Sequence, residues 1–132
     1  MRRLQSVQNA AVRLVTGARR CDHITPTLRL LHWLPVRQRV LLEIAVLVFQ
    51  CLTGQAPSYL ADHSQPVSDH PESLACVVRC ARSTYGDRRR FAAAGPRVWN
   101  SLPAKLQQCD SLGQFKRRSK TCFFGLWDHS AL

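Results

Sequence analysis

Arginines and lysines are the residues of this chain that could do chemistry. They number 19 against 8 aspartates and glutamates, so the net charge is +11, and only three of the 19 are lysines. The guanidinium group of arginine suits paired hydrogen bonds to phosphate oxygens. The candidate phosphate-binding residues are Arg19, Arg20, Arg37, Arg88, Arg89, Arg90, Lys116, Arg117, Arg118 and Lys120. With a sequence pI near 10.5, an anionic polymer is the first partner to expect, although each cluster taken singly also fits a solvated face.

Other site chemistry is poorly represented. Cys76 and Cys80 form the close cysteine pair, but no tight second pair of Cys or His follows at the spacing that zinc sites require. The chain has no glycine-rich phosphate loop, no HExxH and no GxSxG, and no close pair of aspartates for a two-metal site. We therefore expect no enzyme activity, no metal or cofactor, and no small-molecule substrate.

The N-terminus lacks the pattern of a secretory signal, which predicts an intracellular protein of the nucleus or cytoplasm. In that setting the six cysteines would be free thiols. The longest apolar stretch, residues 40–52, is shorter than the roughly 20 residues needed to cross a bilayer, so no membrane partner is expected.

Residues 35–53 predict the central element, a helix. Between Val40 and Leu52 only Glu43 and Gln50 are polar, and at seven residues apart they share one side of a helix. Pro35 suits the first helical position, and Gly54 suits the left-handed position after the end. A helix that is apolar nearly all round should be buried, with Leu47 and Val48 both in the core. Because valine and isoleucine are frequent, a strand is the competing interpretation, which the length and the caps disfavour.

Further helices are predicted on both sides of this element. Residues 3–16 form an amphipathic pattern that ends at Gly17, and a short helix over 26–33 should turn Leu28, Leu31 and Trp33 toward the core. The apolar face of the first helix is predicted to comprise Leu4, Val7, Ala11, Leu14 and Val15.

The second half is expected to be more irregular. Residues 56–60 predict a helical turn, 61–73 a solvated loop, and 74–80 a short β-prone stretch. Gly95-Pro96 predicts a break, followed by helical turns and a last helix over 111–124. Its inner face would hold Leu112, Phe115, Ser119, Cys122 and Phe123. The predicted class is mainly α: a small helical fragment with a buried central helix, divided into 1–61, 62–73 and 74–132.

Several blocks of the chain follow one another in a specific order. They are LQSVQNAAVRLVTG at 4–17, DHITP at 22–26, LHWLPVRQRV at 31–40, GQAPSYL at 54–60, AGPRVWNSLP at 94–103 and FKRRSKT at 115–121. This ordered set resembles the C-terminal region of the reverse transcriptase polyprotein of LINE-type, jockey-like non-LTR retrotransposons. The resemblance implies the thumb and post-thumb region of an RNA-directed DNA polymerase. The catalytic motifs of that family lie upstream of this region, so no catalytic residue carries over.

The resemblance also implies a partner, namely the backbone of RNA or of an RNA–DNA hybrid. The aromatic residues Trp33, Trp99, Trp127, Tyr59 and Tyr85 could then stack on bases, or they could fill the core. Two alternatives stay open. One is a small helical structural or interaction module. The other is a degenerate element without function, since residues 64–76 are shorter than the family pattern.

Overall fold

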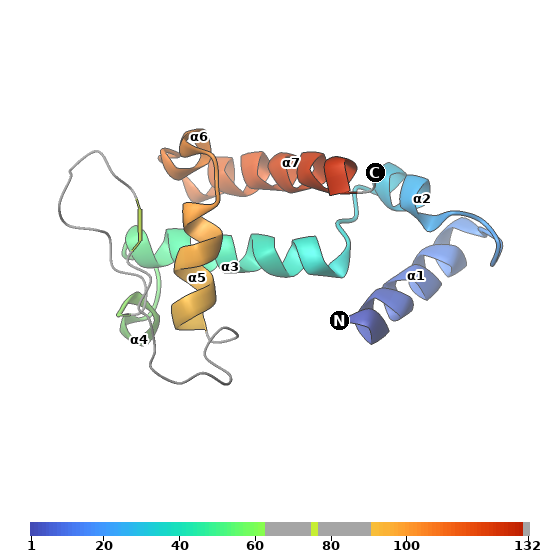
Figure 1. Ribbon diagram of the computed structural model, residues 1–132, viewed down its shortest axis with the longest axis horizontal. Coiled ribbons are helices and arrows are strands. Elements are labelled where there is room, and N and C mark those ends of the chain that lie inside the picture. The colour runs from blue at the N-terminus through green and yellow to red at the C-terminus, as the bar shows by residue number, and fades with distance from the viewer. Residues whose placement is uncertain (63–74, 77–90, 131–132) are drawn as a thin grey trace. The chain divides into compact units, whose positions relative to one another are not determined.

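The structure is a computed structural model that describes residues 1–62, 75–76 and 91–130. Within these ranges the chain forms seven helices and is mainly α, as predicted (Figure 1). The helices are α1 (Arg2–Thr16), α2 (Ile24–Leu30), α3 (Val36–Leu52), α4 (Ser58–Ala61), α5 (Phe91–Asn100), α6 (Ala104–Gln107) and α7 (Leu112–Ser130). Ala61, the first residue of the predicted loop over 61–73, is the last residue of α4. From residue 63 on this loop lies outside the described residues, as do most of the β-prone stretch and the Arg88–Arg90 cluster.

Two glycines end helices as the sequence predicts. Gly17 has φ +68° and Gly54 has φ +71°, a left-handed conformation that favours glycine because it has no Cβ. The Gly17 N–H donates to the Arg13 carbonyl at 2.8 Å, which satisfies an otherwise unpaired carbonyl at the end of α1. At the other end of α3, the Arg39 N–H donates to the Pro35 carbonyl at 3.0 Å, so Pro35 directly precedes the helix.

The chain divides into two compact units, which we describe separately. Unit 1 comprises Met1–Val40 and Phe123–Leu132, and unit 2 comprises Leu41–Cys122. The boundaries fall inside α3 and α7, so each of these helices contributes residues to both units. The division into 1–61, 62–73 and 74–132 stays a prediction, because nearly all of its linker lies outside the described residues.

Three aromatic rings hold unit 2 together. Phe49 of α3 stacks on Phe115 of α7, with ring centroids 4.6 Å apart and an interplanar angle of 17°. Trp99 of α5 lies against both, at 6.4 Å from Phe49 and 5.8 Å from Phe115. All three side chains are buried. Within this unit α3 and α7 run side by side in opposite directions, and α5 crosses α3 (Figure 1).

The central helix is buried on one side rather than all round. Ala45 and Val48 are completely buried, and Phe49 is 3% exposed. Leu47, in contrast, is 36% exposed, so the prediction that both Leu47 and Val48 lie in the core is correct for Val48 and wrong for Leu47. The apolar composition of α3 does not reveal which side will be covered, because the aromatic partners on α5 and α7 come from distant parts of the sequence.

The break predicted at Gly95-Pro96 is absent. Helix α5 continues from Phe91 to Asn100 with Pro96 inside it and buried. Proline normally disrupts a helix interior because it lacks an N–H and its ring crowds the previous turn. Gly95 is needed for a close approach: a Cβ on this residue would lie 3.0 Å from Cγ2 of Val48. Helix α5 is therefore continuous through Pro96 and packs closely against α3 at Gly95.

Helix α1 turns a different face inward from the one predicted. Val12 is completely buried and packs with Leu28 of α2 and Trp127 of α7. Beside Val12, two glutamine side chains bond to the backbone between α2 and α3. Gln8 Nε2 donates to the Leu34 carbonyl at 2.9 Å, and the Val36 N–H donates to Gln5 Oε1 at 2.9 Å. These backbone groups need partners, and the amides of α1 supply them.

The predicted apolar face of α1 is consequently exposed, and that prediction is wrong. Leu4 is 61% exposed, Val7 67%, Leu14 87% and Val15 68%, while Ala11 is half-buried.

Helix α2 ends earlier than predicted, and this changes the position of Trp33. Leu28 is buried and Leu31 packs partly against the same cluster, as expected. His32 follows with φ +52°, a left-handed backbone that takes the chain out of the helix. Its ring lies 6.4 Å from that of Phe124 in an edge-to-face arrangement. Trp33 remains 39% exposed, so its predicted place in the core is wrong.

Candidate nucleic-acid interface

Four of the predicted phosphate-binding residues lie on one short segment of α7. Lys116, Arg117, Arg118 and Lys120 are all exposed. Between Leu112 and Trp127 the helix has no aspartate or glutamate, so no carboxylate lies within one turn of these cations along the helix. We call these four residues the α7 basic face.

Buried side chains hold the α7 basic face outward. Phe115 and Ser119, four residues apart, are both completely buried. The stacked contact of Phe115 with Phe49 leaves the helix little freedom to rotate about its axis. The predicted inner face is confirmed for Phe115, Ser119 and Phe123, while Leu112 and Cys122 are half-buried.

Helix geometry arranges the four cations unevenly. Lys116 and Lys120 are one turn apart, so their Cβ atoms are roughly 6 Å apart. With about 100° per residue, Lys116, Lys120 and Arg117 fall within roughly 100° of one another around the axis, and Arg118 lies about 100° beyond Arg117. Thr121 follows Arg117 by one turn, but its Oγ1 already donates to the Arg117 carbonyl at 3.2 Å. Lys116, Arg117 and Lys120 could therefore contact one backbone strand together.

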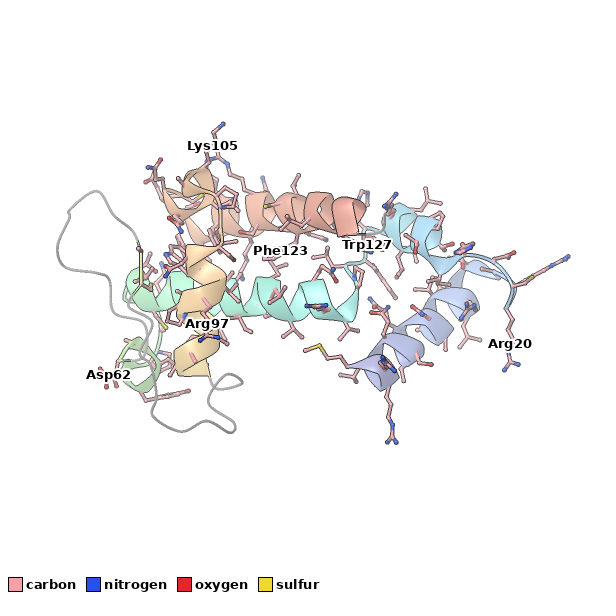
Figure 2. All side chains as sticks on the ribbon, in the orientation of Figure 1. Arg20, Asp62, Arg97, Lys105, Phe123 and Trp127 are labelled. Atoms are coloured by element: carbon pink, nitrogen blue, oxygen red, sulfur yellow. The ribbon has the colours of Figure 1, made fainter. Side chains whose placement is uncertain are left out.

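The other described candidates belong to unit 1. Arg19 and Arg20 are exposed in the loop after α1, and Figure 2 shows Arg20 extending away from that loop. The Arg19 N–H donates to Asp22 Oδ2 at 2.8 Å, which closes a turn but leaves the guanidinium group exposed. Arg37 is exposed in the first turn of α3. Arg88, Arg89 and Arg90 lie outside the described residues.

Sequence reasoning missed two exposed cations of unit 2, Arg97 of α5 and Lys105 of α6 (Figure 2). Arg97 precedes the buried Trp99 by two residues, which places it on the opposite side of the helix. Had the segment been predicted as a continuous helix through Pro96, this spacing would have identified Arg97 as an outward-facing cation.

The aromatic residues divide into core and surface. Trp99 is 1% exposed and Trp127 is 9% exposed, so both fill the interior. Arg29 also covers the Trp127 ring, with its guanidinium carbon 5.2 Å from the centroid. Tyr59 of α4 is 67% exposed and Trp33 is 39% exposed. Among the described aromatics that the sequence suggested for stacking, only these two could meet a base.

Of the close cysteine pair, Cys76 is described and Cys80 lies outside the described residues. Burial, with a smaller effect from Cys51, raises the pKa of the Cys76 thiol to about 11. The backbone of Cys76 is held by Asn100, whose Oδ1 accepts from its N–H at 2.9 Å and whose Nδ2 donates to its carbonyl at 3.0 Å. In the described part of the chain, no three His, Cys, Asp or Glu side chains gather into a possible metal site.

Among the described residues, Cys21, Cys76, Cys109 and Cys122 are free thiols. None of the helices that the structure describes combines the length and apolarity needed to cross a bilayer. Comparisons of the chain with models of protein families, with curated proteins and with solved structures gave no match.

Proposed function

We propose that this protein binds the phosphate backbone of nucleic acid, with the α7 basic face as its main contact. The observation that carries the proposal is the pairing of two faces on one helix. Four cations project from a segment without carboxylates, while Phe115 and Ser119 on the opposite side are completely buried. Cations that are already oriented lose less conformational entropy on binding than cations on a mobile tail.

The composition and the resemblance support the same role. A net charge of +11 dominated by arginine attracts polyanions and favours contacts to phosphate over contacts to bases. We further propose that the chain is a non-catalytic C-terminal part of a LINE-type reverse transcriptase, supporting RNA or a primer–template hybrid. Such a role places it in the nucleus or cytoplasm. The support for this origin is the ordered set of sequence blocks from residue 4 to residue 121.

A salt titration tests the proposal. Affinities for single-stranded RNA, single-stranded DNA and an RNA–DNA hybrid are measured by fluorescence anisotropy over a range of salt concentrations. The logarithm of affinity should fall linearly with the logarithm of salt, by about 0.7 to 0.9 per neutralised phosphate. Replacing Lys116, Arg117 and Lys120 by alanine should reduce the slope by about two to three. The single variant Arg118→Ala should have a smaller effect because of its position around the helix.

The matched control is the triple variant Arg2→Ala, Arg3→Ala, Arg39→Ala, which removes the same charge from exposed positions of unit 1. If both triple variants lose the same slope, binding depends on total charge and the proposed face has no special role. If the unmodified protein fails to bind at low salt, the proposal is wrong. Changing the base sequence of the probe should alter affinity little, since phosphate contacts carry no base information.

A further inference from the structure

Exposed apolar side chains concentrate in unit 1. Nine of the eleven large apolar side chains that remain exposed in the described chain belong to it. Four of them, Leu4, Val7, Leu14 and Val15, lie on α1, each more than 60% exposed. Because Val12, Gln5 and Gln8 attach the helix to its own unit, this apolar face has no partner among the described residues of unit 1.

The spacing of these residues is that of a helix-pairing seam. Leu4, Val7, Ala11 and Leu14 follow one another at intervals of three, four and three residues, which are the a and d positions of a heptad repeat. The stripe is narrow, about 100° wide, and has the small residue Ala11 at its middle, where a second helix could approach closely. A helix that lies on a membrane surface usually has a broader face with aromatic residues, and α1 has no aromatic residue.

Charge indicates which helix would fit. Arg2, Arg3 and Arg13 lie on α1, and no aspartate or glutamate occurs from Met1 to Cys21. Arg3 precedes Leu4, so it occupies a g position beside the seam, where residues of paired helices form ion pairs. A second copy of α1 would bring like charges together in either orientation. A partner with glutamate or aspartate beside its apolar stripe would bring opposite charges together.

We propose that the exposed face of α1 docks an amphipathic helix of another protein, one whose apolar heptad stripe is flanked by acidic residues. The seam from Leu4 to Leu14 is only roughly 15 Å long. The area that a single helix could bury along it is therefore well below the roughly 800 Å² per partner of a standard interface. Binding through this seam should therefore be modest, with a dissociation constant on the order of 10 to 100 µM.

The test uses the full chain and a labelled peptide of three heptads with leucine at a and d and glutamate at e and g. Two control peptides are compared with it: one with lysine at e and g, and one with the acidic composition in scrambled order. At physiological salt, the acidic heptad peptide should bind measurably by fluorescence anisotropy, and each control peptide at least about tenfold more weakly. The scrambled peptide separates seam recognition from simple attraction between a polycation and a polyanion.

Variants of the chain locate the site. The double variant Val7→Gln, Leu14→Gln should weaken binding of the acidic heptad peptide at least about tenfold, because it removes two apolar contacts. Leu30→Gln is the matched control, since Leu30 of α2 is 81% exposed but lies outside the seam, and it should leave binding unchanged. Arg3→Glu should weaken the acidic peptide and strengthen the lysine peptide. Circular dichroism should show that all three variants melt like the unmodified chain, because the replaced side chains are exposed.

Several results would overturn the proposal. These are no saturable binding of the acidic heptad peptide, equal binding by the double variant and the unmodified chain, and equal binding of the scrambled peptide. Sedimentation that shows a dimer abolished by the double variant would identify a second copy as the occupant. Binding to phosphatidylserine vesicles without binding to the peptide would identify a membrane surface. Alanine variants of the α7 basic face should bind the peptide normally, so this result is separable from the nucleic-acid proposal.

Discussion

Helices α1 and α7 contain similar residues but attach to the molecule by different chemistry. Each carries a cluster of basic side chains and an apolar repeat, and neither has an acidic residue in its described side chains. In unit 2, α7 is held by Phe115, which stacks on a ring of α3. In unit 1, α1 is held by one buried valine and by glutamine amides that bond to backbone groups.

This difference shows what a hydrophobic repeat can and cannot determine. A repeat with helical spacing predicts that a face exists, but a partner decides whether the face is covered. The large ring of Phe115 has aromatic partners in reach, so the predicted face of α7 is the buried one. The aliphatic face of α1 has no such partner, and the backbone at Leu34 and Val36 selects the amide side instead.

The largest effect should come from a charge placed in the core of unit 2. Val48→Asp buries a carboxylate at a position with no solvent exposure, which should cost several kcal/mol, on the order of the whole stability of a small domain. Leu47→Asp is the adjacent control at 36% exposure, where the carboxylate can reach water. Its cost should stay within about 1 kcal/mol. Urea denaturation followed by circular dichroism measures both, and equal costs would contradict the one-sided burial of α3.

The apolar faces of the two helices can be compared directly. Phe115→Ala should lower the free energy of unfolding by about 3 to 5 kcal/mol, because it leaves a cavity beside Phe49 and Trp99. Leu14→Ala should change it by no more than about 0.5 kcal/mol, because the side chain is 87% exposed. Thermal melts of the two variants provide the measurement. A large loss for Leu14→Ala in the isolated chain would mean that α1 already buries its apolar face.

Alkaline pH should destabilise unit 2 through Cys76. Burial raises the pKa of this thiol from its ordinary value of 9.0 to about 11, so between these values the native state keeps a proton that the unfolded chain releases. The free energy of unfolding should therefore be unaffected below pH 9 and fall above it, by up to about 1.4 kcal/mol per pH unit. Cys76→Ala should remove this slope while leaving that of other groups. An unchanged slope in the variant would show that Cys76 is not the titrating residue.

The amide attachment of α1 should be measurable at a single residue. Gln5→Ala removes the acceptor of the Val36 N–H and should cost about 1 kcal/mol. Gln114→Ala is the matched control on α7, where the glutamine is exposed, and it should be neutral or slightly stabilising because alanine favours helix. Hydrogen exchange of the Val36 amide offers an independent readout: faster exchange is expected in Gln5→Ala only.

The smallest effect is a gain in stability. Ser119 is completely buried, and its Oγ has no hydrogen-bond partner among the described residues. Ser119→Ala should therefore stabilise the protein by about 1 kcal/mol, since an unsatisfied hydroxyl is removed from the core and alanine favours helix. Ser111→Ala should have the opposite sign, because Ser111 Oγ accepts from the Gln114 N–H at 3.2 Å at the start of α7. Chemical denaturation distinguishes the signs, and a loss of stability in Ser119→Ala would reveal a partner for that hydroxyl.

Much of the helical framework follows from the sequence alone. The glycines after α1 and α3 predict both helix ends because left-handed backbone depends on the residue itself. The two faces of α7 also follow, since large aromatic residues and a run of cations alternate there with helical spacing. The four cations of the α7 basic face are visible in the sequence for the same reason, whereas the exposed cations Arg97 and Lys105 of unit 2 were missed.

Only the tertiary structure decided which of several apolar surfaces is covered. It placed Val48 inside and Leu47 at the surface. It buried Trp99 but left Trp33 exposed. On α1 it turned the two glutamines, Gln5 and Gln8, toward the interior and left Leu4 and Leu14 exposed. The physical reason is that these outcomes depend on partners far away in the sequence: a ring on another helix, or a backbone group that needs a hydrogen bond. Hydrophobic periodicity is a local property of the sequence, whereas burial depends on contacts with residues that are distant in the sequence.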